Sequence, residues 1–377
     1  MPTPRANIDA LHAYTPGEQP QGAEARRVVK LNTNESPYPP SPRAVEALRE
    51  MSADALRRYP SPASRDFCEA AAELHDLQVD QVIATNGGDE LLRLILTAYA
   101  TPSNDATPTG RGGIGVTDPT YSLYPVLAAT HGCSVTVVPR TGAFELDEAT
   151  GQRWNEAGCA VGFVVNPHAP SGKLLGFGPL AEVARAFDGV LVVDEAYVDF
   201  AAHDALGLIR GADALPNVLI LRSMSKGYGL AGLRLGYGLG SAELIGVLHK
   251  ARDSYNVDAV AQAVGEAALR DQAYARTVWQ KVKDERGRLT ETLRGMRFDV
   301  GESHANFVLA KVPADAGVPA GKLYEMLKSK GVLVRYFDAA GLTDRLRITV
   351  GTAEQNGRLI EELAEAIAAP VAAGGDA

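Results

Sequence analysis

The chain has 377 residues, 46% of them hydrophobic, so it can bury a core large enough for two or three domains. Its formal net charge of -9 argues against nucleic acid and membrane surfaces as partners, because both require a basic face. Three cysteines without close Cys-x-x-Cys spacing predict neither a disulfide framework nor a zinc site, and we expect no metal.

The first 40 residues are rich in proline, glycine and charge, which predicts an arm that other surfaces must order. They hold no apolar run of signal-peptide length, and no later window is long enough to span a membrane, so we expect a cytoplasmic protein. Ser41 and Pro42 supply an N-cap and a first helical residue for a helix to about residue 51. Ser64 predicts the start of a second helix, which ends near residue 75.

Short apolar runs alternate with helical stretches from residue 82 to residue 222. Uniformly apolar strands are typical of a mainly parallel sheet with helices on both faces. Ligands of such sheets bind at the carboxyl ends of the strands, where Asn166, Asp194 and residues 223–226 stand. The runs lie at 82–85, 114–117, 135–138, 161–165, 190–193 and 218–221.

The segment Asn-Gly-Gly-Asp-Glu at 86–90 joins the first of these strands to an apolar helix. Two glycines at a helix start expose N–H groups to an anion, so we expect Gly88 and Asp89 in a phosphate site. Tyr121 follows Asp-Pro-Thr at 118–120 and is placed to stack on a ring. A plain strand-to-helix turn and a core aromatic are the alternatives.

Asp194 closes the strand at 190–193. A carboxylate at this position can keep the nitrogen of a pyridine ring protonated, which makes the ring a better electron sink. Tyr197, three residues later, can hydrogen bond to a phenolic oxygen on the same ring. The alternatives are an aspartate that caps the next turn and a tyrosine that packs on a sheet edge.

Two serines, a lysine and an arginine follow the last of these strands. Lys226 can condense with an aldehyde, and buried neighbours would lower the pKa of its amine toward reactivity. Ser223, Ser225 and Arg234 can hold a phosphate through charge-assisted hydrogen bonds. A reactive amine, a phosphate cup and a partner for a pyridine ring together indicate pyridoxal 5'-phosphate as the cofactor.

The end of the chain has a different pattern. Helical segments from about 242 to 296 precede three strand-like runs that alternate with helices, at 306–310, 332–336 and 346–350, which predicts a smaller α+β domain. Arg335 and Arg347 lie in these runs, and each requires an anionic partner. A substrate carboxylate or phosphate is one hypothesis, and internal ion pairs are the other.

Taken together, these segments resemble the fold-type I pyridoxal-phosphate-dependent aminotransferases, and within them the histidinol-phosphate aminotransferase family of histidine biosynthesis. The resemblance runs nearly end to end, and the Ser-x-Ser-Lys with its trailing arginine is specific to the superfamily. The matching segments are Tyr-Thr-Pro-Gly at 14–17, Lys-Leu-Asn-Thr-Asn-Glu-Ser-Pro at 30–37, Arg-Tyr-Pro at 58–60, residues 86–90 and 119–121, Val-Asp-Glu-Ala-Tyr at 193–197, residues 221–226 and 229–234, and Leu-Arg-Ile-Thr-Val-Gly at 346–351.

The resemblance implies an α/β fold like that of aspartate aminotransferase. Residues 41–258 would form the large domain, with a mainly parallel seven-stranded sheet between helices that binds the cofactor. Residues 259–377 would form the small α+β domain. Residues 1–40 would be an arm that contributes to the small domain and the dimer interface.

The resemblance also implies a homodimer with shared active sites, in which Tyr59 reaches the cofactor phosphate of the neighbouring subunit. Arg347 would bind the carboxylate of glutamate or 2-oxoglutarate. Tyr14, Asn34 and Arg335 would help to hold the anionic amino donor, L-histidinol phosphate.

For catalysis, the resemblance implies that Lys226 holds the cofactor and then moves a proton from the substrate α-carbon as general acid and base. Asp194 and Tyr197 would assist it through the cofactor ring. The two substrates would react in turn, with ping-pong kinetics.

One segment departs from the family pattern. Family members usually show Asn-Asn-Pro-Thr-Gly where this chain has His-Ala-Pro-Ser-Gly at 168–172, so Ala169 replaces the asparagine that bonds the phenolic oxygen. Our hypothesis is that His168 or Asn166 takes over this contact while Tyr197 keeps its own.

Three other activities stay open. The segment Gly-Tyr-Gly-Leu-Ala-Gly at 227–232, with Asp253 downstream, spells a dinucleotide-binding fingerprint and makes a nucleotide-dependent dehydrogenase a distant alternative. Its context is wrong, because no strand runs straight into the glycines. An aromatic amino acid aminotransferase and a phospho-amino-acid decarboxylase would share Lys226 and Asp194 with the first choice.

Overall fold

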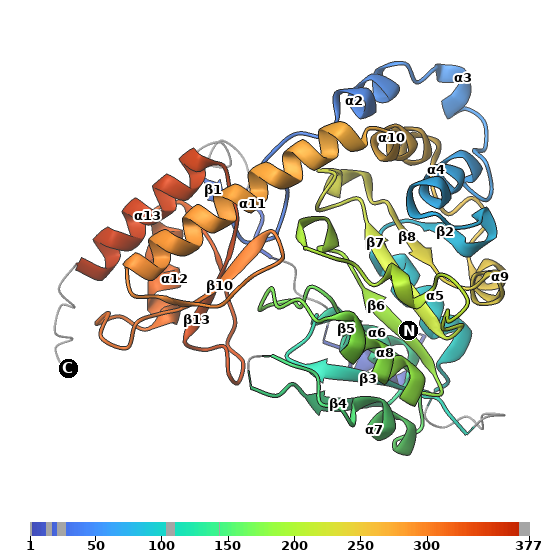
Figure 1. The fold of residues 1–377 in the computed structure, drawn as a ribbon, viewed down its shortest axis with the longest axis horizontal. Coiled ribbons are helices and arrows are strands. Elements are labelled where there is room, and N and C mark those ends of the chain that lie inside the picture. Colours follow the sequence, from blue (N-terminus) through green and yellow to red (C-terminus); the bar gives the residue numbers. More distant parts are fainter. Residues whose placement is uncertain (1, 13–16, 21–27, 103–109, 143, 369–377) are drawn as a thin grey trace.

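The fold is given by a computed structural model, which describes residues 2–12, 17–20, 28–102, 110–142 and 144–368. Figure 1 shows a large unit built on a twisted sheet and a smaller unit beside it, with the long helix α11 (Gln272–Gly295) running along the smaller unit toward the larger one. The predicted combination of a large α/β unit and a small α+β unit is confirmed.

The sheet of the large unit has seven strands in the order β2-β8-β7-β6-β5-β3-β4. All neighbours are parallel except β8, which is antiparallel to both β2 and β7. Six strands match the predicted apolar runs, and β8 was missed. The strands are β2 (Val82–Thr85), β3 (Gly113–Asp118), β4 (Val135–Pro139), β5 (Cys159–Val165), β6 (Val190–Asp194), β7 (Val218–Ser223) and β8 (Gly236–Leu239).

Two apolar layers bury both faces of this sheet, which explains why its strands do not alternate with polar residues. In β6, Leu191 and Val193 pack on one side with α4 (Arg65–His75), α7 (Thr150–Glu156), α8 (Phe177–Ala186) and α10 (Ala259–Arg270). Val190 and Val192 pack on the other side with α5 (Gly88–Tyr99), α6 (Leu123–His131) and α9 (Ala242–Ala251). The carboxyl ends of the parallel strands are therefore fixed by packing on both sides.

The small unit is built on an antiparallel sheet in the order β12-β13-β10-β9. A separate parallel pair joins β1 (Val29–Lys30) of the arm to β11 (Val332–Leu333), so the arm packs on this unit. The remaining strands are β9 (Asp299–Val300), β10 (Phe307–Lys311), β12 (Arg335–Tyr336) and β13 (Arg345–Thr349), and the helices are α12 (Ala320–Ser329) and α13 (Ala353–Ala368).

Two predicted helices, from 41 to about 51 and from 64 to about 75, correspond to α2 (Pro42–Arg49) and α4, and their bounds differ only slightly. The short helices α1 (Ala6–Asp9) and α3 (Ala53–Leu56) were not predicted. The hydroxyl of Ser41 accepts from the backbone N–H of Arg43 at 3.1 Å, as an N-cap does, whereas Ser64 takes a left-handed backbone and makes no side-chain cap bond.

The boundary predicted at residue 258 stays a prediction. Helix α10, which follows it, packs on α2 and α4 and shares the buried cluster of the large unit. We therefore propose that the small unit begins within α11.

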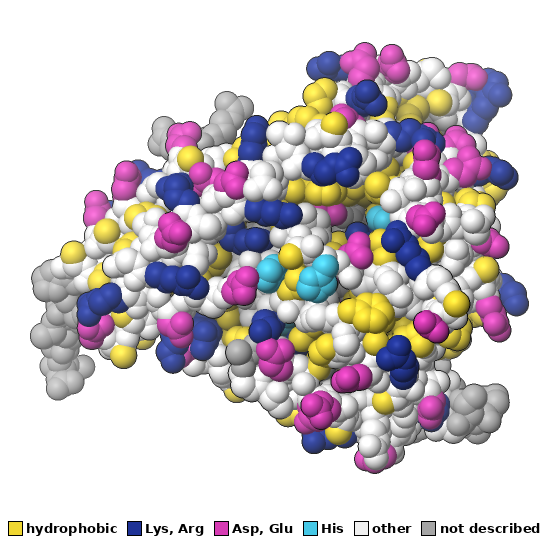
Figure 2. Space-filling view, in the orientation of Figure 1, with side chains coloured by type: hydrophobic (Ala, Val, Ile, Leu, Met, Phe, Trp, Pro, Cys, Tyr) yellow, Lys and Arg dark blue, Asp and Glu magenta, His cyan; other side chains and the backbone are white. Residues whose placement is uncertain are grey.

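None of the helices in the described part of the chain combines the length and apolar character needed to cross a bilayer. On the face shown in Figure 2, basic and acidic side chains are interspersed rather than gathered into a basic stripe.

Candidate active site

A cavity of about 530 Å³ opens between the carboxyl ends of the parallel strands and the small unit. This volume is in the range of small-molecule sites, and the position is the one that open α/β sheets use for ligands. Its described walls include most of the residues that the sequence singled out: Asn34, Gly88, Asp89, Tyr121, Asp194, Tyr197, Ser223, Ser225, Lys226, Arg234, Arg335 and Arg347.

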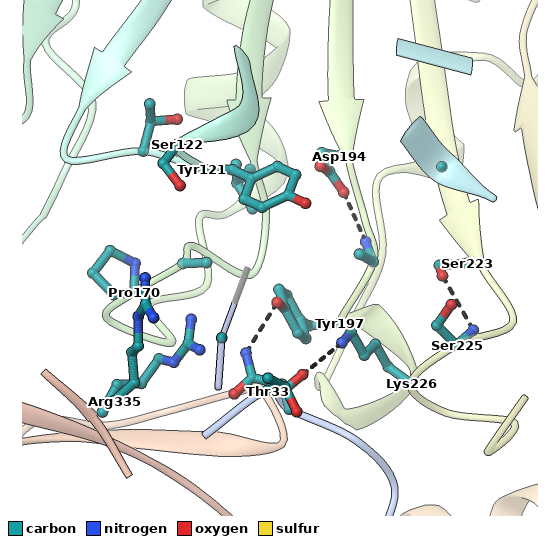
Figure 3. Close-up of a pocket in the computed structure, with 18 of the residues that line it drawn as sticks. Thr33, Tyr121, Ser122, Pro170, Asp194, Tyr197, Ser223, Ser225, Lys226 and Arg335 are labelled. Atoms are coloured by element: carbon teal, nitrogen blue, oxygen red, sulfur yellow. Dashed lines mark hydrogen bonds between the residues drawn. The ribbon is translucent and has the colours of Figure 1, made fainter. Parts of the chain in front are cut away.

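Lys226 lies in the turn after β7, and its amine points into the cavity (Figure 3). Its Nζ donates to the backbone carbonyl of Thr33 at 2.9 Å. Burial and the positive charge of Arg347 lower the pKa of Lys226 from 10.5 to about 8, against the attraction of Glu35. About half of these amines are therefore unprotonated at pH 8, the form that attacks an aldehyde.

Asp194 ends β6 at the floor of the cavity. Its Oδ2 accepts from the hydroxyl of Tyr124 at 2.7 Å, and its Oδ1 accepts from the N–H of Ala196 at 3.1 Å. Burial raises the pKa of this carboxyl above its usual value, and within the described residues it makes no ion pair. A buried acid without a cation favours a positively charged ligand atom, and the protonated nitrogen of a pyridine ring is one.

The start of α5 and the turn after β7 form an anion cup. Gly88 and Asp89 open the helix, so its free N–H groups point outward beside the guanidinium of Arg234. The Arg234 Nη2 lies 3.5 Å from the Asp89 carboxylate, a long and exposed contact. A Cβ added at Gly87 would stand 2.8 Å from the same Nη2, so this glycine leaves the room that the guanidinium occupies.

Two serines complete the cup from the other side. Ser223 is the last residue of β7, and its hydroxyl accepts from the N–H of Ser225 at 3.1 Å (Figure 3). Hydroxyls, helix N–H groups and a guanidinium around one space are the groups that bind phosphate. With Lys226 and Asp194 in the same cavity, the site fits pyridoxal phosphate.

Two tyrosines face the space between the lysine and the aspartate. Tyr121 lines the cavity and meets the ring of Tyr124 edge-on, with 5.5 Å between ring centroids. The hydroxyl of Tyr197 accepts from the amide Nδ2 of Asn34 at 3.0 Å (Figure 3). Both positions agree with the predicted contacts to a cofactor ring, and these roles remain proposals.

Two arginines line the opposite wall. Arg335 and Arg347 face each other directly across β12 and β13. Arg347 donates to the carbonyl of Asn32 at 2.9 Å, and its guanidinium lies over the rings of Phe307 and Phe337. Two positive charges on neighbouring strands repel each other, and an anionic ligand that contacts both would relieve this repulsion. The pair therefore favours an anionic ligand.

The structure gives no support to the hypothesis that His168 or Asn166 replaces the missing asparagine, which stays a prediction. The Oδ1 of Asn166 accepts from the N–H of Leu175 at 2.8 Å, and its Nδ2 faces the carbonyl of the same residue. His168 contacts the hydroxyl of Ser171 and the carbonyl of Pro119. The described cavity wall includes neither side chain, and Ala169 presents its methyl group there instead.

Two other predicted residues are not among the described residues of the cavity wall. Tyr59 is 81% exposed and stacks on Tyr255, outside the cavity of its own chain. Tyr14 lies outside the described residues.

The sequence prediction missed Tyr124 and Thr33, the hydrogen-bond partners of Asp194 and Lys226. Tyr124 follows Tyr121 by three residues, but its position in the sequence is also that of an ordinary core aromatic.

Comparison with known proteins decides the family. The family model described as "Aminotransferase class I and II" matches residues 26–363. The chain belongs to this family. It is a pyridoxal-phosphate-dependent aminotransferase of fold type I, as its sequence resemblance predicted.

The relatives of this aminotransferase include histidinol-phosphate aminotransferase 1 of Trichormus variabilis, 42% identical over 95% of this chain and 97% of the relative. The histidinol-phosphate aminotransferase of Syntrophus aciditrophicus is 38% identical over 94% of this chain and 96% of the relative. Among solved structures, the histidinol-phosphate aminotransferase of Sinorhizobium meliloti in complex with pyridoxal-5'-phosphate superimposes with a TM-score of 0.84, at 26% identity, over 96% of this chain and 97% of that one.

Proposed function

We propose that this aminotransferase moves the amino group of L-histidinol phosphate to 2-oxoglutarate, a step of histidine biosynthesis. The observation that carries the proposal is the pair Arg335 and Arg347, a second cationic site in the cavity that also holds the anion cup. The cup would hold the cofactor phosphate, and the pair would take the phosphate of the donor or a carboxylate of the acceptor. The names of the relatives support the same substrate.

When bound, pyridoxal phosphate supplies an electron sink for the carbanion formed at the substrate α-carbon. Lys226 is the base that the chain supplies, since its lowered pKa leaves a neutral Nζ able to accept the α-proton and return it. Asp194 lies at the floor of the cavity, where its carboxylate would hold a proton on the ring nitrogen. Arg335 and Arg347 would orient the substrate so that its α-carbon faces Lys226.

The donor can be identified with purified holoenzyme. We expect histidinol phosphate, added alone, to bleach the yellow absorbance of the bound cofactor, and we expect phenylalanine, tyrosine and leucine to act far more slowly. Replacing Arg335 by methionine should lower kcat/KM for histidinol phosphate about 10- to 100-fold, which corresponds to the loss of one charge-assisted hydrogen bond. The kcat/KM for leucine, which has no phosphate, should change much less. A faster response to aromatic donors would instead favour an aromatic aminotransferase, and release of carbon dioxide from a phosphorylated amino acid would favour a decarboxylase.

We also propose that the enzyme is a homodimer whose active sites are shared. Apolar side chains are exposed on and beside α2 and α3, with Leu48 at 51%, Leu56 at 61% and Tyr59 at 81%. Such a patch is typical of an interface. Sedimentation velocity should therefore give twice the chain mass of 39.9 kDa, and Leu56→Asp should shift the enzyme toward monomer. A monomer at micromolar concentration would refute the proposal.

A cytoplasmic location remains a proposal. The three cysteines, Cys68, Cys133 and Cys159, are buried and unpaired, which agrees with a reducing compartment. Recovery of the enzyme from a periplasmic fraction would count against it.

A further inference from the structure

Asn34 joins three separate parts of the fold at the cavity. It lies in the arm, with the left-handed φ of 55° that asparagine tolerates better than most residues. Its backbone carbonyl accepts from the Nδ2 of Asn306, just before β10, and its backbone N–H donates to the hydroxyl of Thr349, at the end of β13. Its side chain reaches Tyr197 of the large unit. Asn34 is buried, so these bonds fix its position.

Both ends of the Asn34 amide have hydrogen-bond partners. The Thr349 hydroxyl accepts from the backbone N–H of Asn34 at 3.0 Å and lies 3.0 Å from the Asn34 Oδ1. The Thr349 hydroxyl can accept from the N–H and donate its single hydrogen to the Oδ1. The NH2 end of the amide faces the Tyr197 hydroxyl, which accepts at 3.0 Å.

This arrangement determines the direction of the Tyr197 hydroxyl hydrogen. Because the oxygen accepts from Asn34, its own hydrogen must point away from Asn34. The hydroxyl lines the cavity that holds Lys226 and Asp194. On the adjoining wall, Ala169 presents a methyl group, and the amide of Asn166 is engaged by Leu175. The two side chains that we first expected to supply a donor there are thus turned away.

We propose that Asn34 is a positioning residue that turns the Tyr197 hydroxyl toward the phenolic oxygen of the cofactor. The hydroxyl then donates to this oxygen, and so stands in for the hydrogen bond that Ala169 cannot make. Asn34 acts through Tyr197 rather than by its own contact with the cofactor. Since Thr349 and Asn306 hold Asn34 from the small unit, the orientation of Tyr197 depends on how that unit is docked.

The proposal predicts the sign of a spectroscopic change. A hydrogen-bond donor stabilises the negative charge of the phenolic oxygen most when the neighbouring Lys226 nitrogen carries no proton. Such a donor therefore lowers the pKa of the Lys226 nitrogen when that nitrogen is bonded to the cofactor. Loss of the donor should raise this pKa. The charged groups around Lys226, which are Arg347, Glu35, Arg234 and Asp89, stay unchanged in every variant below.

The test is a pH titration of the cofactor absorbance in holoenzyme without any substrate, so its outcome does not depend on which amine is the natural donor. Asn34→Gly keeps the left-handed backbone and adds no charge. We expect it to raise the midpoint by about half a unit to one unit, the size of one net hydrogen bond. Tyr197→Phe should raise it at least as much, and the double variant should match Tyr197→Phe alone.

Asn217 provides a matched control at the opposite end of β7. Its Nδ2 donates to the carbonyls of Ala184, Phe187 and Gly189, so Asn217→Gly should lower the melting temperature without moving the titration. An unchanged midpoint in Asn34→Gly, or a double variant whose shift is the sum of the two single shifts, would overturn the proposal. If Asn34→Gly yields no holoenzyme, Thr349→Val removes the hydroxyl that holds the same amide, and it takes the place of Asn34→Gly in the comparison with Tyr197→Phe. An unchanged midpoint, or additive shifts in the double variant, would again overturn the proposal.

Discussion

Replacing Lys226 by arginine should lower the turnover number by about 10⁴-fold or more, because arginine keeps the positive charge but lacks a nucleophilic, basic amine. The guanidinium stays protonated at every workable pH, so it can neither bond to the cofactor aldehyde nor accept a proton from the substrate. The lysine is suited to both tasks, since burial and Arg347 bring its pKa down to about 8. Steady-state turnover and the loss of the yellow absorbance both measure the effect.

Lys283 is a suitable control for this substitution. It is a half-buried lysine whose Nζ donates to the carbonyl of Ala201, and burial lowers its pKa as well. It lies outside the described cavity wall, so Lys283→Arg should leave turnover nearly unchanged. More than about 1% of turnover remaining in Lys226→Arg would contradict the role of Lys226.

Replacing Asp194 by asparagine should lower turnover by about 10²- to 10⁴-fold. An uncharged amide of the same shape cannot hold a proton on the ring nitrogen, and loss of one partner of a buried ion pair costs about 3–5 kcal/mol. The fold should survive, because the amide oxygen can accept from the N–H of Ala196 as the acid does, and the hydroxyl of Tyr124 can rotate to accept from the amide NH2. Turnover and the absorbance spectrum of the bound cofactor are the measurements.

The stability of the protein without cofactor should change in the opposite direction. Burial raises the pKa of Asp194 in the folded state, so its charged form destabilises the fold, and this penalty fades as the pH falls through that pKa. Asp194→Asn removes the penalty, and the cofactor-free variant should melt no lower than the parent. Asp258→Asn makes the same change at the N-cap of α10 and should alter neither property. Turnover within tenfold of the parent in Asp194→Asn would contradict its proposed role.

The sequence predicted the parts of this fold that depend on local pattern. Six apolar runs located six strands, because burial on both faces leaves no polar position. The strand β8 was missed because its two glycines look like a loop. In the fold, a Cβ at Gly236 would stand 2.9 Å from the backbone N of Gly88, so glycine is what allows β8 to approach the start of α5.

The site was predictable where side chains follow directly from strand ends, as Asp194 and Ser223 do. It was not predictable where a contact depends on distant backbone. Asn166 also follows a strand, yet its amide turns to Leu175, nine residues later, and this turn leaves no trace in the spacing of residues. The bond between Asn34 and Tyr197 joins residues 163 positions apart, so only the folded chain reveals it.

The covalent attachment of the cofactor to Lys226 is the central claim, and borohydride reduction followed by peptide mapping tests it most directly. Reduction should trap the cofactor on the peptide that contains Lys226 and on no other lysine, and Lys226→Arg should take up no label. A label on a different lysine, or none on the reduced yellow enzyme, would contradict the account.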